Sequence, residues 1–169
     1  QTFLSGVATD SHRLSSSSLE VNLKGDFSPI IIHRKTVFQL CSLLSESNSK
    51  LSMQTTDNKV KFKLGNIKLV SKVIDGKFPD YNKVVPKNND KSLEVSSKDF
   101  INSIERVTSV SLDRKEGVKL IISKENVQLL VNSANSGDGN EAIKANFTSD
   151  NITISFNSKY LIDIASEIE

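Results

Sequence analysis

The sequence predicts an α+β fold assembled from repeated units, each consisting of a strand, a helix and three further antiparallel strands. The first observation behind this prediction is a lysine that opens three similar amphipathic segments, at Lys35, Lys98 and Lys159, about every 60 residues. A fixed interval of this kind indicates an internally repeated architecture. The second observation is that apolar and polar residues alternate between these segments, which is the period of half-buried strands.

The composition is that of a globular protein. The 169 residues are 37% hydrophobic, which is enough to form one large core or two small ones. We find no apolar run of the roughly 18 residues that a membrane span needs, and no leader resembling a signal peptide. The single cysteine, Cys41, is expected to be a buried structural thiol, and the lack of a disulfide framework fits a cytoplasmic location. Because the chain begins at Gln1, we expect it to be part of something longer.

The N-terminal part is expected to form two strands and then the first complete unit. Residues 3–14 form a strand that runs into a polar string, and renewed alternation places the serine-rich residues 15–18 in a second strand. Gly25-Asp26 is expected to turn the chain. A buried strand at 30–32 then leads into a helix, whose apolar residues are Val37, Phe38, Leu40, Cys41 and Leu44.

Three strands are expected after this helix, at 51–55, 60–64 and 67–73. Asp57-Asn58 and Gly65-Asn66 lie between them and suit tight hairpin turns. The following segment contains Pro79 and Pro86, which prevent regular ladder pairing because proline lacks an N–H donor and restricts the residue before it. We therefore expect one domain at 1–86 and a second at 87–169.

The second domain is expected to repeat the same order. Ser96 and Asp99 form a capping box, in which Ser96 accepts a hydrogen bond from an unpaired backbone N–H and Asp99 is favoured by the helix dipole. This helix should end near Ser111. We expect strands at 118–123 and 127–132, a polar loop at 133–140, a last strand at 142–148, and then a strand at 152–156 with a helix running to Glu169.

Three strings carry a family resemblance. They are Ala8-Thr9-Asp10-Ser11-His12-Arg13-Leu14, then Asp75-Gly76-Lys77-Phe78-Pro79-Asp80-Tyr81 with Val84, Pro86 and Lys87 after it, and Phe156-Asn157-Ser158-Lys159-Tyr160. In this order and at this spacing they resemble the bacterial DNA polymerase III beta subunit, the sliding clamp family, over the whole chain. In that family three similar domains, each of two such units, form a protomer, and two protomers close a ring with antiparallel sheets outside and helices lining the interior.

The resemblance implies that 1–86 is the C-terminal part of the middle clamp domain and that 87–169 is the larger, N-terminal part of the third. It implies a noncatalytic processivity factor without metal or cofactor, which encircles duplex DNA independently of sequence. Its implied partners are the DNA polymerase III alpha subunit, the clamp loader and other proteins with a clamp-binding motif. The full-length protein would be a homodimer, with helix 98–110 and residues 112–116 as candidate contacts.

A peptide-binding groove between the middle and third domains is the sharpest implication. The positions that match are Thr9, Ser11, His12, Arg13, Leu14, Pro79, Val84, Asn157 and Tyr160. Leu14, Pro79 and Val84 would be apolar anchors, and a few buried anchors usually supply most of the binding energy of such a site. Ser11 departs from the family, because this position is often glycine there.

The candidate DNA-facing residues lie on the three helices. They are Arg34, Lys35, Lys98, Asn102, Arg106 and Lys159. Lys98, Asn102 and Arg106 share one helix face at spacings of four residues. The net charge of +2 is weak for a nucleic-acid binder, so DNA contact would depend on how charge is arranged. A solvated helix face is the ordinary explanation for any one of these residues, and their recurrence on equivalent helices favours a DNA-facing surface.

Two other functions stay open from the residues themselves. One is an α+β hydrolase that uses Asp10, His12 and Asp80, and the other is a soluble peptide-binding module unrelated to DNA. Against the enzyme, the chain has no glycine-rich phosphate loop, no CxxC pair and no HExxH helix. The spacing of Asp75 and Asp80 does not fit a calcium loop either.

Overall fold

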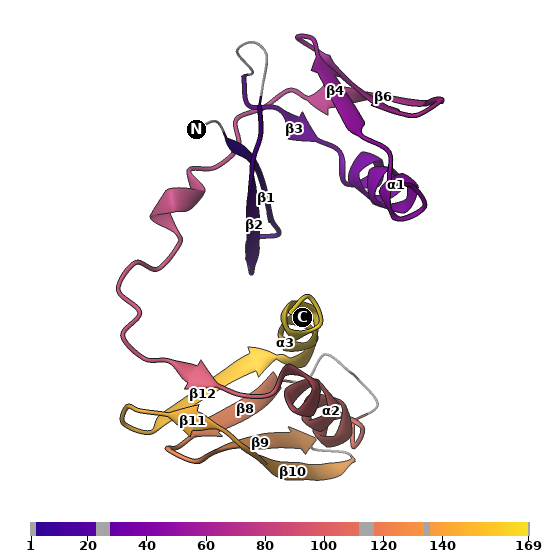
Figure 1. The fold of residues 1–169 in the computed structure, drawn as a ribbon. Helices are drawn as coiled ribbons and strands as arrows, with labels where there is room; N and C mark the ends of the chain where they lie inside the picture. Colours follow the sequence, from indigo (N-terminus) through magenta and orange to yellow (C-terminus); the bar gives the residue numbers. More distant parts are fainter. Residues whose placement is uncertain (1–2, 23–27, 112–116, 134–135, 169) are drawn as a thin grey trace. The chain divides into compact units, whose positions relative to one another are not determined.

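The computed structural model describes residues 3–22, 28–111, 117–133 and 136–168. They fall into two compact units, 1–85 and 86–169 (Figure 1). The expected turn at Gly25-Asp26 and the candidate dimer contact at 112–116 lie outside the described residues. The predicted α+β class is confirmed, since antiparallel sheets and helices alternate in the repeated order. Within the described ranges we find no helix long and apolar enough to cross a membrane.

The first unit contains a hairpin and a four-stranded sheet. Strands β1 (Phe3–Thr9) and β2 (Leu14–Glu20) pair antiparallel along their whole length, which confirms the serine-rich strand. The sheet has the order β3-β6-β5-β4. Its elements are β3 (Ile31–Ile32), α1 (Arg34–Ser45), β4 (Leu51–Thr55), β5 (Lys59–Leu64) and β6 (Ile67–Ile74).

Helix α1 touches this sheet through its first turn. Thr36 is the buried residue of the helix, and its hydroxyl lies 2.8 Å from that of Ser71 on β6. Ser71 is paired with Val60, which is fully buried, so α1 lies on the apolar face of the sheet. The prediction that Cys41 is buried is wrong, because Cys41 is exposed on the same helix as Phe38, which is 61% exposed, whereas Leu40 and Leu43 are half-buried.

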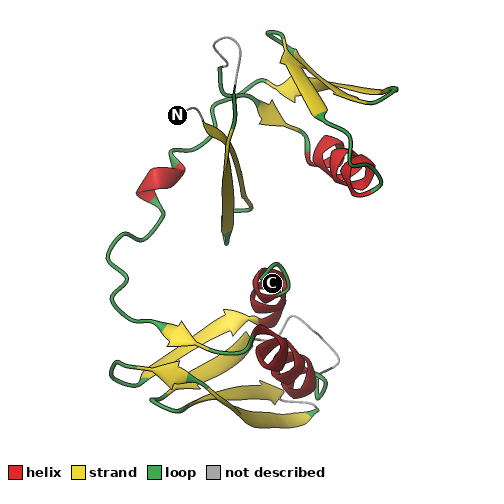
Figure 2. Ribbon diagram, in the orientation of Figure 1, coloured by secondary structure: helices red, strands yellow, loops and turns green. Residues whose placement is uncertain are grey.

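The second unit contains a larger core. Its main sheet has the order β10-β9-β8-β12, and helix α2 packs on β9 and β10 and lies beside α3 (Figure 2). The core consists of Ile104, Val107, Val118, Leu120, Ile122, Val127, Leu129, Val131 and Phe147. The elements are β7 (Leu93–Glu94), α2 (Ser97–Thr108), β8 (Gly117–Ile122), β9 (Asn126–Ser133), β10 (Gly137–Lys144), β11 (Asn146–Phe147), β12 (Ile152–Asn157) and α3 (Ser158–Ala165).

The helix ends in this unit follow local rules. The Ser96 hydroxyl accepts a hydrogen bond from the Asp99 N–H at 3.3 Å, which confirms the predicted cap. Helix α2 ends at Thr108, three residues earlier than expected. Helix α3 ends at Ala165 and does not run to Glu169, since Glu167 and Ile168 donate to carbonyls three residues back in a tighter turn.

The prediction of a polar loop at 133–140 is wrong for its second half, because strand β10 already begins at Gly137. Gly139 is buried, and a Cβ atom at this position would lie 2.3 Å from the Val107 carbonyl oxygen. The glycine therefore lets α2 approach the strand backbone, and it does not mark a turn. The expected last strand is also divided, since β10 ends at Lys144 and the short β11 pairs with β7.

Candidate functional site

The turn between β1 and β2 holds five of the nine predicted peptide contacts. Thr9 begins it: its hydroxyl accepts the Ser11 N–H at 3.2 Å and donates to the Arg13 carbonyl at 2.7 Å. Ser11 has φ of 73°, so the turn does use the left-handed conformation that favours glycine. In this chain Ser11 adopts that conformation, and the Thr9 hydroxyl bonds to the backbone N–H of Ser11 and to the carbonyl of Arg13 beyond it.

Asp10 fixes the other half of this turn. Its Oδ1 accepts the backbone N–H groups of His12 and Arg13, both at 3.1 Å, and its Oδ2 accepts Arg13 Nε at 3.1 Å. The hydrogen bond from the His12 backbone, together with those from Arg13, holds the pKa of Asp10 below its usual value. Arg13, the predicted polar contact, and Leu14, the first predicted apolar anchor, are both half-buried. Each side chain is therefore partly packed against the protein and partly open to solvent.

Pro79 and Val84 flank a single 3₁₀ turn, η1 (Tyr81–Lys83). The Val84 N–H donates to the Tyr81 carbonyl at 3.1 Å, and Lys83 pairs with Asp80 at 3.4 Å. Pro79 is exposed, and Val84 is 69% exposed. This segment thus presents apolar surface to solvent, as a peptide-binding wall would.

Asn157 and Tyr160 belong to the second unit. Asn157 caps α3, since its Oδ1 accepts the Lys159 N–H at 3.0 Å, and Tyr160 follows in the first turn. Both side chains are half-buried. The structure therefore places the predicted peptide contacts in two groups, one in each compact unit.

The candidate DNA-facing residues have different surroundings. Arg34 stacks over the Phe38 ring, with 5.1 Å between the guanidinium carbon and the ring centre. Lys35, Lys98 and Lys159 are exposed at the beginnings of their helices. A hollow of about 430 Å³ lies between α2 and α3, and its lining residues are Ser97, Lys98, Ile101, Asn102, Ala165, Ser166 and Ile168.

Arg106 differs from the lysines because it has an acidic partner. Its Nε donates to Glu141 Oε2 on β10 at 2.9 Å, and Ser103 donates to the other carboxylate oxygen at 2.9 Å. The hydrogen bond with Glu141 raises the pKa of Arg106, and the hydrogen bonds from Arg106 and then Ser103 lower the pKa of Glu141. The helix period alone could not reveal this pair, because Glu141 lies on a strand that follows much later in the chain.

The residues of the hydrolase hypothesis form separate local pairs. The Asp10 carboxylate is bound within its own turn, and Asp80 pairs with Lys83. Among the residues that the structure describes, no three His, Cys, Asp or Glu side chains are grouped to hold a metal ion.

Comparison with known proteins gives a consistent result for both units. Residues 2–80 match the family described as DNA polymerase III beta subunit, central domain, and residues 82–169 match the family described as its C-terminal domain. The beta sliding clamp of Caulobacter vibrioides is 32% identical over 99% of this chain. The chain spans 45% of the length of that relative.

Solved structures agree with the sequence comparison. The crystal structure of the sliding clamp from Bartonella birtlesii has a TM-score of 0.91 and 40% identity, with 99% of this chain and 48% of that chain covered. The same clamp bound to griselimycin has a TM-score of 0.93 and 40% identity, with coverage of 99% and 45%.

Proposed function

Because this chain belongs to the DNA polymerase III beta subunit family, we propose that it is part of a DNA sliding clamp, which encircles duplex DNA and tethers the replicative polymerase. The observation that carries this proposal is the match of the two units, in order, to the central and C-terminal domains of the family. On this basis residues 1–86 are the C-terminal part of the middle domain, and residues 87–169 are the larger part of the third.

The proposed role is noncatalytic. A tethered polymerase gains effective concentration at the primer end, and this gain needs geometry and linkage but no reacting side chain. The local pairing of Asp10 and of Asp80 agrees with such a role. We place the protein in the cytoplasm, with a homodimeric ring formed by the full-length protein.

The partner site of this clamp is a peptide groove made from the two groups of contacts. The first group supplies Arg13, pre-oriented by Asp10, and the exposed apolar surface of Pro79 and Val84. Asn157 and Tyr160 supply the second. Polymerase, clamp loader and other replication proteins would each insert a short segment with apolar anchors, since a few buried anchors carry most of the energy of such contacts.

The DNA-facing side of the ring would use the exposed lysines at the beginnings of the three helices. Lysine contacts the phosphate backbone as a point charge and carries no base-specific geometry, which suits a protein that must move along any sequence. Arg106 is expected to contribute less than Lys98, because Glu141 already neutralises it.

The test is a fluorescence-anisotropy titration with a labelled polymerase-derived clamp-binding peptide. We expect saturable binding that the double variant Arg13→Ala, Pro79→Ala loses. The variant Arg34→Ala, Pro29→Ala removes the same residue types outside the proposed groove and should bind like the wild type. Equal binding by all three proteins would contradict the groove.

A further inference from the structure

One face of the sheet in the first unit is covered with lysines. Strand β5 alternates strictly, with Val60, Phe62 and Leu64 buried on the side where α1 lies. Successive side chains of a strand point to opposite faces. The other face of β5 therefore carries Lys59, Lys61 and Lys63.

Strand β6 adds two more lysines to the same face. In the antiparallel register Lys72 lies opposite Lys59, and Lys68 lies opposite Lys63. Side chains that are directly opposite in this way have Cβ atoms about 4.5–5.5 Å apart, and like charges at that distance repel. We call the set Lys59, Lys61, Lys63, Lys68 and Lys72 the lysine face.

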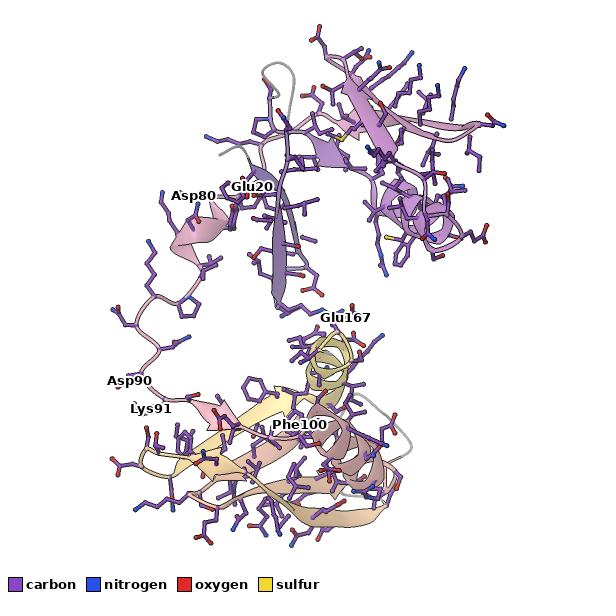
Figure 3. The ribbon with its side chains drawn as sticks, viewed as in Figure 1. Glu20, Asp80, Asp90, Lys91, Phe100 and Glu167 are labelled. Atoms are coloured by element: carbon purple, nitrogen blue, oxygen red, sulfur yellow. The ribbon has the colours of Figure 1, made fainter. Side chains whose placement is uncertain are left out.

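No acidic side chain offsets this charge within the sheet. The neighbours of Lys63 and Lys61 on β4 are Ser52 and Gln54, and the remaining β6 residue on this face is Val70. Among the described residues, no ion pair involves any of the five lysines. Four of them are exposed and Lys61 is half-buried, and Figure 3 shows long nitrogen-tipped side chains rising from the sheet on the side away from α1.

From this arrangement we infer that the lysine face binds the phosphate backbone of duplex DNA, at a second surface separate from the helices. Lysines two residues apart on a strand recur about every 6.8 Å, and a duplex carries one negative charge per roughly 1.7 Å of its axis. Several phosphates can therefore be contacted at once. The repulsion within the two opposed lysine pairs is relieved when an anion lies between them.

The occupant follows from what this face lacks. Protein–protein interfaces are depleted in lysine and depend on aromatic or apolar anchors, and the aromatic residue of β5, Phe62, is buried on the opposite face. Single-stranded nucleic acid is usually held by bases stacked on aromatic side chains, which this face does not offer. Duplex DNA, which presents its backbone and needs no stacking, is the polyanion that fits.

The experiment measures anisotropy of a labelled duplex of about 20 base pairs with the 169-residue chain, from roughly 50 to 200 mM salt. The variant Lys63→Gln, Lys68→Gln removes one opposed pair. If both lysines contact phosphates, the slope of log K against log salt should become shallower by about 1.8, which is about 0.9 for each phosphate that the variant no longer neutralises. This variant should melt no lower than the wild type, because a repulsive pair has been removed.

The matched control is Lys91→Gln, Lys144→Gln. Lys91, labelled with Asp90 in Figure 3, already pairs with the Asp90 carboxylate, and Lys144 is an exposed strand residue of the second unit. The control should keep the wild-type slope. Equal slopes for the two double variants would overturn the proposal, as would undetectable binding by the wild type at the lowest salt.

Two further arms separate this surface from its alternatives. Lys98→Gln reports on the helix surface of the proposed clamp. If Lys98→Gln lost duplex binding while the Lys63→Gln, Lys68→Gln variant kept the wild-type affinity and salt slope, the lysine face would be rejected and the proposed clamp function would stand. Phosphatidylserine vesicles probe a lipid partner. If the Lys63→Gln, Lys68→Gln variant lost vesicle binding and kept duplex binding, the lysine face would be a membrane surface and the proposal would be wrong.

Discussion

The Asp10 carboxylate holds the Arg13 side chain at 3.1 Å and also accepts the backbone N–H groups of His12 and Arg13. One residue thus fixes both the path of the turn and the direction of the guanidinium. A group held in its binding conformation loses less entropy when a partner arrives. Asp10 is absent from the predicted peptide contacts, and if Arg13 binds the peptide as proposed, Asp10 would act as its positioning residue.

Asp10→Asn is expected to weaken binding of the clamp peptide by roughly two- to tenfold, the effect of one or two hydrogen bonds of ordinary strength. The β1–β2 ladder does not depend on this carboxylate and should persist. Anisotropy titration gives the affinity, and the amide NMR spectrum of β1 and β2 reports the ladder. Asp57→Asn, in the turn between β4 and β5, is the control, and an equal loss there would contradict a specific role for Asp10.

Ser11→Gly is expected to stabilise the hairpin by up to about 1 kcal/mol. Removing the side chain relieves the left-handed backbone, at φ of 73°, and the greater freedom of unfolded glycine offsets part of that gain. Hydrogen exchange of the β1 and β2 amides measures the change. Ser17→Gly, in the middle of β2, should instead destabilise the same hairpin by about 0.5–1 kcal/mol, so slower exchange in that variant would be a contrary result.

Gly139→Ala is expected to destabilise the second unit by about 1–3 kcal/mol or more, as overpacking does in a filled core. The new Cβ would lie 2.3 Å from the Val107 carbonyl oxygen, which is backbone and cannot rotate away. Chemical denaturation measures the change in the free energy of unfolding. Gly117→Ala on β8 is the matched control, because its Cβ would meet the Phe156 carbonyl oxygen at 3.7 Å, an ordinary contact.

Acid should destabilise the second unit through Glu141. Arg106 donates hydrogen bonds that lower the pKa of Glu141 in the folded state. The Glu141 carboxylate is therefore protonated more readily in the unfolded chain than in the folded protein. The stabilisation is fully present above a pH of about 4.3, the usual glutamate pKa, and is lost as the pH falls through the lower folded-state value. Thermal melts across this range should show a flatter pH dependence for Glu141→Gln, whereas Glu105→Gln, exposed on the same helix as Arg106, should follow the wild type.

Local patterns were sufficient to predict most of the fold. The alternation after residue 14 placed β2 correctly despite its four serines, and the Ser96 cap needed no tertiary information. The errors came from contacts that are distant in the sequence. Gly139 resembled a loop residue, because glycine is required there by the close approach of the Val107 carbonyl, which the sequence does not show. Cys41 resembled a core residue, because the sequence cannot show how little of α1 the sheet covers.

The site could be predicted from the sequence only as a set of candidate positions. The family strings marked Arg13, and the structure adds Asp10 as the residue that orients it. The helix period marked Arg106 as equivalent to Lys98, whereas its pairing with Glu141 depends on how β10 meets α2. The lysine face was readable in the alternation of residues 59–64, but only the register with β6 shows that the charges are directly opposed.

The pairing of β12 with β8 sets an order for folding during synthesis. Residues 152–157 complete the sheet beside residues 117–122, which leave the ribosome much earlier. Until Asn157 has emerged, β8 has an exposed edge next to an already formed β9, and such an edge can pair with other chains. At the usual rate of about 5–20 residues per second this interval lasts several seconds, so this sheet is most vulnerable to misassembly just before β12 appears.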